Sequence, residues 1–344
     1  MRTAAPIRWR ARGAAHLAVL LAVSSLAACG DDSPTSPTTF SLSCPASFEV
    51  KSPTGQPVVV TYPPPLPIGG TSPVTASCTP VSGATFPVKA TTVQCAATDR
   101  SQRTATCSFT VTVTPPPYVK YTRYLAFGDS MTEGQDGLPS ASGAGLYVPL
   151  VVRPEIAYPT RLQERFTTLY TAQTTQVVNR GRGGESAVDG AKRLPTDITT
   201  YRPEVVLLLE GANDIFGGNT AGVARASAAL RTMVRDTKAR GLPVYLATLP
   251  PENPAGSRGG GYALVVPLNT EIQKIATEEG AVLVDIYTAF NGDLTLIGPD
   301  GLHPNEAGYL RMAETFLLRI RATLEIPFPG VSAAAVVEPG GRFP

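Results

Sequence analysis

From residue 124 to residue 324, short apolar segments alternate with amphipathic segments of helical length. The apolar segments end in turns rich in Gly, Asn or Asp, and the longer segments place apolar residues three and four positions apart. This alternation predicts a parallel sheet covered by helices on both faces, with active residues at the carboxyl ends of the strands. About two hundred residues are ample for one core of this type. We therefore expect a three-layer α/β/α domain.

The elements of this domain follow from the same patterns. The predicted strands begin with Tyr124–Phe127 and a short strand from Gln176, and continue with Val205–Leu209, Val244–Leu249 and Ala281–Ile286. The predicted helices lie near Tyr158–Tyr170, Ala221–Arg240, Val265–Glu279 and Asn305–Leu324, the last with an apolar set of Leu310, Met312, Phe316, Leu317 and Ile320. Long loops are expected at Gln135–Ile156 and Pro251–Tyr262. A role in substrate access and a plain solvated surface both stay open for these loops.

The chain holds two histidines, and His16 lies in a segment with the features of an export signal. The other, His303, stands in the loop Asp300-Gly301-Leu302-His303-Pro304. On one tight turn, the Asp300 carboxylate can accept the Nδ1 proton of His303 and leave Nε2 as a base. A lone histidine is more often a packing or surface residue, so the pair needs a nucleophile before it indicates catalysis.

A serine in a suitable place ends the first predicted strand. The apolar run Tyr124–Phe127 stops at Gly128-Asp129-Ser130, which puts the Ser130 hydroxyl at the carboxyl end of a strand. Three common residues also recur by chance in ordinary turns. Position after a strand favours, but does not settle, a nucleophile at Ser130.

Two further segments follow predicted strands between Ser130 and His303. One is Asn179-Arg180-Gly181-Arg182-Gly183-Gly184, a Gly-rich turn that opens a helix and can aim a backbone N–H at an anion. The other is Gly211-Ala212-Asn213-Asp214. Taken singly, each is also consistent with an ordinary turn or a helix cap.

Together these four segments resemble the sequence blocks of the SGNH, or GDSL, hydrolases, in the family's order and over residues 120–325. The resemblance implies a serine esterase or lipase with Ser130 as nucleophile, His303 as base and Asp300 as its partner. It also implies an oxyanion hole made by the backbone N–H groups of Ser130 and Gly184 and by the Asn213 amide. The neighbouring Asp129 and Asp214 are expected to support the site. No cofactor is implied.

Other catalytic classes lack their signatures in this chain. There is no G-x-S-x-G elbow, H-E-x-x-H, C-x-x-C or Walker A sequence. No metal site is therefore predicted, although binding by carboxylates alone stays open. Without residues 1–28, 25 basic residues stand against 27 acidic ones, a net charge of −2, so no nucleic-acid partner is expected.

The N-terminus predicts export. Four arginines precede an apolar run that ends in Leu26-Ala27-Ala28-Cys29, and this run is too short to span a membrane. The ending resembles a bacterial lipobox, which implies removal of residues 1–28, lipidation of Cys29 and attachment to the cell envelope, followed by a flexible linker over 29–40. An ordinary signal with a secreted product is the alternative.

The remaining cysteines all lie in a small Thr-, Val- and Pro-rich segment, residues 41–114; they are Cys44, Cys78, Cys95 and Cys107. An even number in an exported module predicts two disulfides, and alternating segments such as Cys107–Val113 predict a small β-sandwich. The segment resembles the hyalin-repeat (HYR) module, an immunoglobulin-like domain. Three pairings are possible, of which we favour Cys44–Cys107 with Cys78–Cys95. A Pro-rich linker (115–119) follows the module, and a disordered tail is expected over 326–344.

An HYR-like module also fits a different class of protein. In this alternative the chain is a surface adhesion or glycan-binding protein, and the hydrolase domain is secondary or acts only as a carbohydrate deacetylase. The intact set of Ser130, Gly184, Asn213, Asp300 and His303 favours the enzyme. The acyl chain and alcohol of the ester are not specified by this set. The one tryptophan, Trp9, lies in the signal segment, which disfavours a polysaccharide substrate, since Trp stacks best on sugars.

Overall fold

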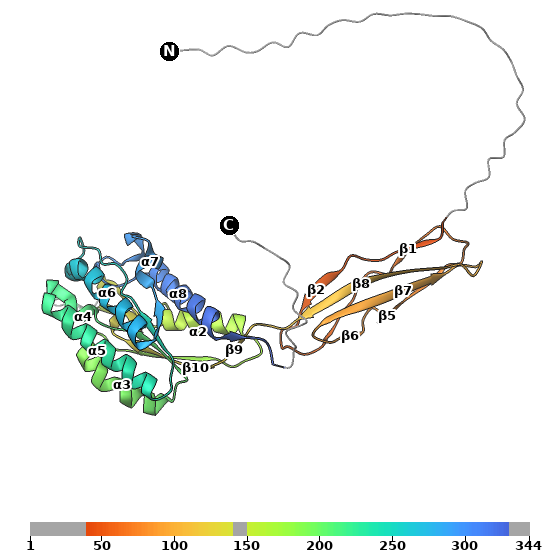
Figure 1. The fold of residues 1–344 in the computed structure, drawn as a ribbon. Coiled ribbons are helices and arrows are strands. Elements are labelled where there is room, and N and C mark those ends of the chain that lie inside the picture. The colour runs from red at the N-terminus through yellow and green to blue at the C-terminus, as the bar shows by residue number, and fades with distance from the viewer. Residues whose placement is uncertain (1–38, 140–149, 330–344) are drawn as a thin grey trace, which may run out of the picture.

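Two bodies make up the part of the chain that the structure describes. The structure is a computed structural model, and it describes residues 39–139 and 150–329. A β-rich module precedes an α/β domain, and a short connection joins them (Figure 1). The predicted signal and Cys29 lie outside the described residues. Within these residues, no helix has the length and apolar character needed to cross a membrane.

A five-stranded parallel sheet forms the centre of the α/β domain. Its order is β13-β10-β14-β15-β16, so the first strand, β10, lies between the second and the third. Ligands of open parallel sheets bind where the strand order reverses, here at the ends of β13, β10 and β14. The strands are β10 (Arg123–Gly128), β13 (Gln176–Gly181), β14 (Val205–Leu209), β15 (Val244–Ala247) and β16 (Val282–Val284). All five residues of β14 are buried, as expected for an apolar strand covered on both faces.

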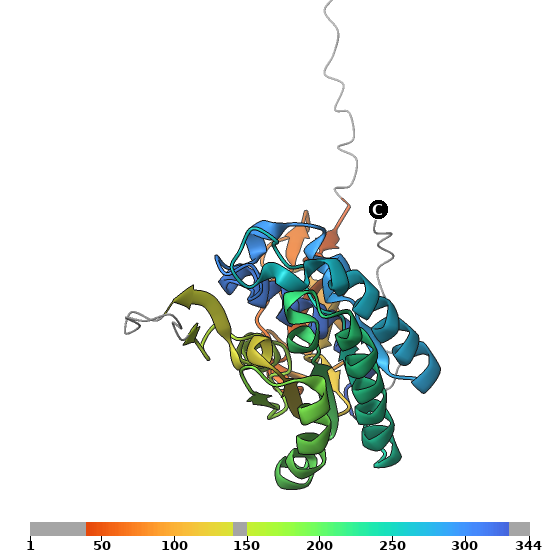
Figure 2. The same ribbon diagram turned by 90° about the vertical axis from the view of Figure 1, so that its left-hand side faces the viewer.

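Helices cover both faces of this sheet. On one face α3, α5 and α6 contact one another in that order, and on the other α2 contacts α8 (Figure 2). The long helices are α2 (Tyr158–Leu169), α3 (Ala187–Tyr201), α5 (Thr220–Ala239), α6 (Tyr262–Glu279) and α8 (Glu306–Leu324). Short elements are α1 (Ser130–Glu133), α4 (Ala212–Ile215), α7 (Ile286–Phe290), η1 (Phe216–Gly218), η2 (Gly259–Gly261) and η3 (Leu294–Leu296). The predicted three-layer α/β/α class is confirmed.

Helix α8 shows why the predicted helices form. Asn305 caps it by accepting a hydrogen bond from the Gly308 N–H at 3.1 Å, and its apolar residues recur every three or four positions. Phe316 stacks on Tyr158 of α2 with ring centroids 4.9 Å apart. Of the expected apolar set, Leu310 and Leu317 are only partly buried, and Tyr309 and Ala313 lie in the core instead.

The segment expected as one long loop, Gln135–Ile156, differs from that expectation. Its two ends pair as antiparallel strands, β11 (Gln135–Pro139) and β12 (Leu150–Val152). Tertiary contact explains the difference, because β11 packs directly on the turn that carries Asp300. A Cβ on Gly137 would lie 2.5 Å from Asp300 Oδ1. The pairing therefore depends on contacts with a distant part of the chain, which local sequence does not reveal.

The N-terminal module is a small β-structure around its own core. Its main sheet has the order β2-β8-β7-β5, and two shorter antiparallel pairs, β1–β4 and β3–β6, complete it. The core contains Val93 and Val111, both fully buried, and Phe109. The strands are β1 (Ser41–Ser43), β2 (Phe48–Lys51), β3 (Val58–Val59), β4 (Leu66–Ile68), β5 (Thr75–Thr79), β6 (Thr85–Phe86), β7 (Ala90–Thr98) and β8 (Thr104–Thr114). The predicted β-rich, disulfide-bonded module is confirmed.

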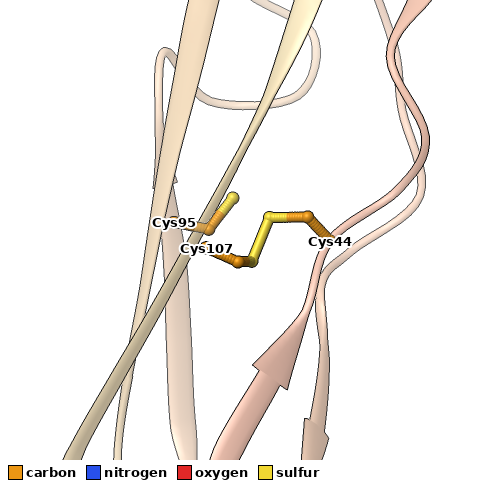
Figure 3. Close-up of side chains that lie close together, drawn as sticks. All are labelled: Cys44, Cys95 and Cys107. Atoms are coloured by element: carbon orange, nitrogen blue, oxygen red, sulfur yellow. A yellow bond between two sulfur atoms is a disulfide. The ribbon is translucent and has the colours of Figure 1, made fainter.

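Two disulfides join the strands of this module, and they have the pairing that we favoured from the sequence. Cys44 is bonded to Cys107, and Cys78 to Cys95. Cys95 and Cys107 face each other across β7 and β8, so the Cys44–Cys107 bond lies beside the Cys95 side chain (Figure 3). The sulfur atoms of Cys44, Cys95 and Cys107 lie within 4.8 Å of one another. All three take part in disulfides, which accounts for this clustering without a metal.

The ends of the α/β domain extend beyond the boundaries expected from the sequence. Tyr118–Val119 (β9), assigned to the linker, pair with Glu325–Ile326 (β17), of which Ile326 is the first residue of the expected tail. Val119 is fully buried in the core of the α/β domain. Phe328 packs edge-on against Tyr118 at 5.5 Å and against Gly55 of the module. Ile326 and Phe328 therefore contact residues that lie far away in sequence.

Candidate active site

Ser130 lies at the carboxyl end of β10, the strand at the centre of the topological reversal. It is the first residue of α1, and Asp129 caps this helix by accepting a hydrogen bond from the Met131 N–H at 2.9 Å. The turn folds back tightly onto the sheet. A Cβ on Gly128 would lie 2.1 Å from Thr132 Oγ1 and 2.2 Å from the Leu209 carbonyl oxygen, so the turn requires glycine. The Ser130 side chain is thereby held in place.

A single tight turn before α8 brings Asp300 and His303 to Ser130. His303 Nε2 lies 2.8 Å from Ser130 Oγ, and His303 Nδ1 lies 2.6 Å from Asp300 Oδ2. The turn is closed by the hydrogen bond from the Gly298 N–H to the His303 carbonyl oxygen at 2.7 Å. All three side chains are buried, with His303 only 1 % exposed. The structure thus brings together the three residues predicted from sequence as nucleophile, base and partner.

The electrostatics of the turn favour a charged Asp300. Burial alone would raise the pKa of Asp300, but the hydrogen bond and charge of His303, with the N–H groups of His303 and Leu302, outweigh it and lower this pKa. These N–H groups each donate to Asp300 Oδ1 at 3.0 Å. Asp300 therefore remains ionised at neutral pH and can hold the Nδ1 proton of the imidazole. By contrast, burial raises the pKa of Asp129 to about 6.

Gly184 and Asn213 lie at the ends of the strands on either side of β10. Gly184 follows β13 with a φ of +76°, in the left-handed region, and a Cβ there would meet no atom within 4 Å. Asn213 lies in α4 after β14, and its Nδ2 donates a hydrogen bond to the Glu185 carbonyl oxygen at 2.9 Å. Asp214 Oδ2 accepts the Ala187 N–H at the start of α3, at 2.8 Å. These bonds connect the loops that carry Gly184 and Asn213.

The loop from Pro251 to Tyr262, whose role stayed open, is bound to the Asp300 turn. The Asn253 N–H donates to the Gly301 carbonyl oxygen at 2.8 Å, and the Arg258 N–H to the Asp300 carbonyl oxygen at 2.7 Å. Glu252, in the same loop, is buried. Burial raises the pKa of Glu252 to about 7, although a hydrogen bond from the Gly261 N–H acts in the opposite direction. This part of the loop therefore supports the turn that presents His303.

Sequence reasoning missed a group of buried charges beside the site. Glu185 and Glu210 are buried, and Arg193 on α3 contacts Glu185 through its guanidinium. One signal was available, since Glu185 directly follows Gly184 and Arg193 lies about two helical turns farther along. Nothing in local sequence shows that their side chains point inward at the same place.

Comparison with known proteins identifies the family. Residues 126–311, more than half of the chain, match the GDSL-like lipase/acylhydrolase family, and residues 35–113 match the HYR domain. The chain is 28% identical over 131 residues to a multidomain esterase of Ruminococcus flavefaciens, a match that spans 37% of this chain and 17% of that protein. It is 26% identical over 217 residues to an acetylxylan esterase of Geobacillus stearothermophilus, spanning 58% of this chain and 93% of that protein.

Two solved structures illustrate the similarity of this chain to known folds. A lipase/acylhydrolase from Enterococcus faecalis is 22% identical, with a TM-score of 0.49 over 61% of this chain and all of that one. The acetylxylan esterase from Geobacillus stearothermophilus is 24% identical, with a TM-score of 0.45 over 59% of this chain and 95% of that one. From its sequence match and its parallel α/β architecture, the chain belongs to the GDSL-like lipase/acylhydrolase family and is a carboxylic ester hydrolase with an N-terminal HYR domain.

Proposed function

We propose that the chain is a serine esterase in which Ser130 attacks the ester carbonyl and forms an acyl-enzyme. The observation that carries this proposal is His303, whose two ring nitrogens lie 2.8 Å from Ser130 Oγ and 2.6 Å from Asp300 Oδ2. With the Nδ1 proton held by His303 and donated to the Asp300 carboxylate, Nε2 accepts the Ser130 proton as the Oγ–carbon bond forms. The imidazolium then protonates the leaving alcohol. In the second step, His303 takes a proton from water as the water oxygen attacks the acyl carbon. The imidazolium then returns this proton to Ser130 Oγ as the acyl–Oγ bond breaks and the acid leaves.

The oxyanion of each tetrahedral intermediate would be held at the ends of three neighbouring strands. We assign its donors as the backbone N–H groups of Ser130 and Gly184 and the Nδ2 amide of Asn213. The Asn213 amide has two N–H groups, and one donates to the Glu185 carbonyl oxygen at 2.9 Å. The second is available for the substrate. Because the Asn213 amide is held by Glu185 before substrate binds, it needs little reorganisation when charge develops.

Replacing Asn213 by alanine is expected to lower kcat by about 10²- to 10³-fold, the usual cost of losing one oxyanion donor. KM should change little, because the amide acts on charge that develops after binding. Steady-state kinetics on a nitrophenyl ester measures both constants. Asn219→Ala, outside the proposed site, is the matched control. Wild-type turnover by Asn213→Ala would remove this side chain from the oxyanion hole.

For the substrate, we propose an acetylated carbohydrate. The relative from Geobacillus stearothermophilus is named an acetylxylan esterase. Two exposed aromatic rings support this class: Phe216, which directly follows α4 and is 48% exposed, and Tyr262 at the start of α6, which is 53% exposed. Their segments are neighbours, since η1 contacts η2. Rings of this kind can stack on sugar faces and could replace the tryptophan that is absent from residues 10–344.

The test compares nitrophenyl esters of graded acyl length with acetylated xylan and lysophospholipid. Release of acetate from xylan and a preference for the shortest acyl chain are expected, with Ser130→Ala inactive on every ester. A preference for long acyl chains or lysophospholipid would replace the carbohydrate ester by a lipid. Equal turnover by Ser130→Ala would overturn the serine mechanism itself.

We also propose that the enzyme is exported and anchored through a lipid on Cys29. The proposal rests on the basic and apolar N-terminal sequence that ends in Leu26-Ala27-Ala28-Cys29, and on two disulfides, which persist in oxidising compartments. Mass spectrometry of the N-terminal peptide from the membrane fraction should show a diacylglyceryl group on Cys29. An unmodified Cys29 in the culture medium would indicate a secreted enzyme instead.

A further inference from the structure

Arg193 on α3 contacts the strand that carries Ser130 and the loop that carries Gly184. Its Nε donates to Glu185 Oε1 and Oε2 at 2.9 and 3.0 Å, and its Nη2 also donates to Glu185. The guanidinium carbon lies 3.9 Å from the centre of the Phe127 ring, and Nη2 lies 3.4 Å from the Gly128 carbonyl oxygen. Phe127 and Gly128 are the last two residues of β10. One side chain thus joins the end of β10 to Glu185.

Glu185 in turn connects Arg193 to the Asn213 amide. Its side chain is 2% exposed and held by the guanidinium, while its main-chain carbonyl accepts the Asn213 Nδ2 hydrogen bond. Both ends of the residue are therefore fixed by partners. A buried carboxylate that loses its partner must reach water or another donor, so the peptide that contacts Asn213 would shift with it.

The groups around Arg193 explain why its guanidinium pairs with Glu185. Its Nη1 donates to Asp197 Oδ2, one turn along α3, at 2.6 Å, and this bond aims the guanidinium. Glu210, which directly follows β14, is fully buried, and neither of its oxygens has a hydrogen-bond partner within residues 39–139 and 150–329. Burial, and then the charges of Asp129 and Glu185, raise the pKa of Glu210 well above its ordinary value. The positive charge of Arg193 therefore faces Glu185 and Asp197, the two carboxylates that its guanidinium contacts.

We propose that Arg193 is a positioning residue for the oxyanion hole: it holds Glu185 against the end of β10, and the Glu185 carbonyl orients the Asn213 amide toward the ester oxygen at Ser130. The proposal rests on the serine esterase mechanism proposed above. Arginine is required because one side chain must donate to two carboxylates in a plane and stack on an aromatic ring, whereas the ammonium of lysine is a point donor.

A double-mutant cycle tests whether Arg193 acts through Asn213. Arg193→Lys is expected to lower kcat by about 10- to 100-fold with little change in KM, because small displacements of catalytic groups have effects of this size. In the Asn213→Ala background the same substitution should lower kcat by less than about threefold, since the group that it positions is gone. Arg235→Lys is the matched control: Arg235 of α5 pairs with Glu279 of α6, and this variant should retain wild-type kcat.

A second variant covers the case in which Arg193→Lys does not fold. Glu185→Gln keeps the shape of the side chain but removes the charge that pairs with the guanidinium, and it should show the same dependence on Asn213. Thermal unfolding identifies any variant whose loss of activity is only loss of fold. Equal losses of kcat with and without the Asn213 amide, or wild-type kcat in both variants, would overturn the proposal.

A spectroscopic readout separates this proposal from the esterase mechanism. The side-chain amide signals of Asn213 can be assigned by NMR as the pair that is missing in Asn213→Ala. One of these protons is bonded to the Glu185 carbonyl oxygen, so the two should be well separated in the wild type and closer together in Arg193→Lys. If the wild type hydrolyses no ester, the proposed function fails while this measurement still decides the role of Arg193. Asn213 amide signals that are the same in the wild type and in Arg193→Lys would overturn the proposed role of Arg193.

Discussion

Replacing His303 by alanine is expected to lower kcat for ester hydrolysis by about 10⁵- to 10⁶-fold, the loss seen when a nucleophile–base pair is broken. The reason is that His303 is the base within hydrogen-bond distance of Ser130 Oγ, at 2.8 Å, and the rest of residues 17–344 contains no other imidazole to replace it. KM should stay close to the wild-type value, because His303 moves the Ser130 proton in the chemical step and does not contribute to ester binding. Single-turnover kinetics on a nitrophenyl ester measures the loss.

Ser130 and His303 should have non-additive effects on kcat when both are replaced. The double variant Ser130→Ala/His303→Ala is expected to be no slower than either single variant, because neither group works without the other. Circular dichroism and thermal unfolding confirm that each variant keeps its fold. Additive losses in the double variant, or His303→Ala within tenfold of wild type, would contradict a shared role.

Replacing Asp300 by asparagine is expected to lower kcat by about 10⁴-fold with the turn intact. Asparagine keeps an oxygen for the N–H groups of Leu302 and His303, which bond to Asp300 Oδ1 at 3.0 Å. Its NH₂ group would then face His303 Nδ1, where Asp300 Oδ2 now lies at 2.6 Å. Because an NH₂ group can only donate there, the imidazole must carry its proton on Nε2 and can no longer accept the proton of Ser130.

The dependence of the free energy of unfolding on pH gives a second test of Asp300→Asn. The pKa of Asp300 is lowered in the folded protein, so its carboxylate stabilises the fold above the ordinary pKa of aspartate, and this contribution is lost as pH falls through the lowered value. The asparagine variant should therefore lose less stability on acidification than the wild type. Asp293→Asn is the control for activity: Asp293 caps the short helix η3 at the surface, and the variant should keep wild-type kcat. Hydrogen bonds from Thr295 lower the pKa of Asp293 too, so its asparagine variant should also lose less stability on acidification while kcat stays unchanged. Wild-type kcat in Asp300→Asn would exclude Asp300 as the partner of His303.

Much of the fold and of the candidate site could be predicted because local residue patterns carried the information. The five buried residues of β14 form an unbroken apolar run, and the residues that follow β10, β13 and β14 lie together because the carboxyl ends of parallel strands share one edge. The proximity of Asp300 and His303 needed only a three-residue spacing on a turn. The pairing of Cys44 with Cys107 came from the resemblance to the HYR module, not from spacing.

Other features depend on residues that meet only after folding. The β11–β12 pair forms where Gly137 packs on Asp300, and β9 is ordered by β17, which lies about two hundred residues later. The same holds for Arg193, whose role needs Phe127, Glu185 and Asp197 to converge on one guanidinium. Strand and turn patterns are local, so the order of residues in the chain was enough to place Ser130, Gly184 and Asn213 after strands that share one edge of a sheet. The grouping of His303 with them came from the resemblance to the SGNH hydrolases. The buried charges that hold these residues in place meet through packing between the sheet and its helices. Local sequence patterns do not encode this packing.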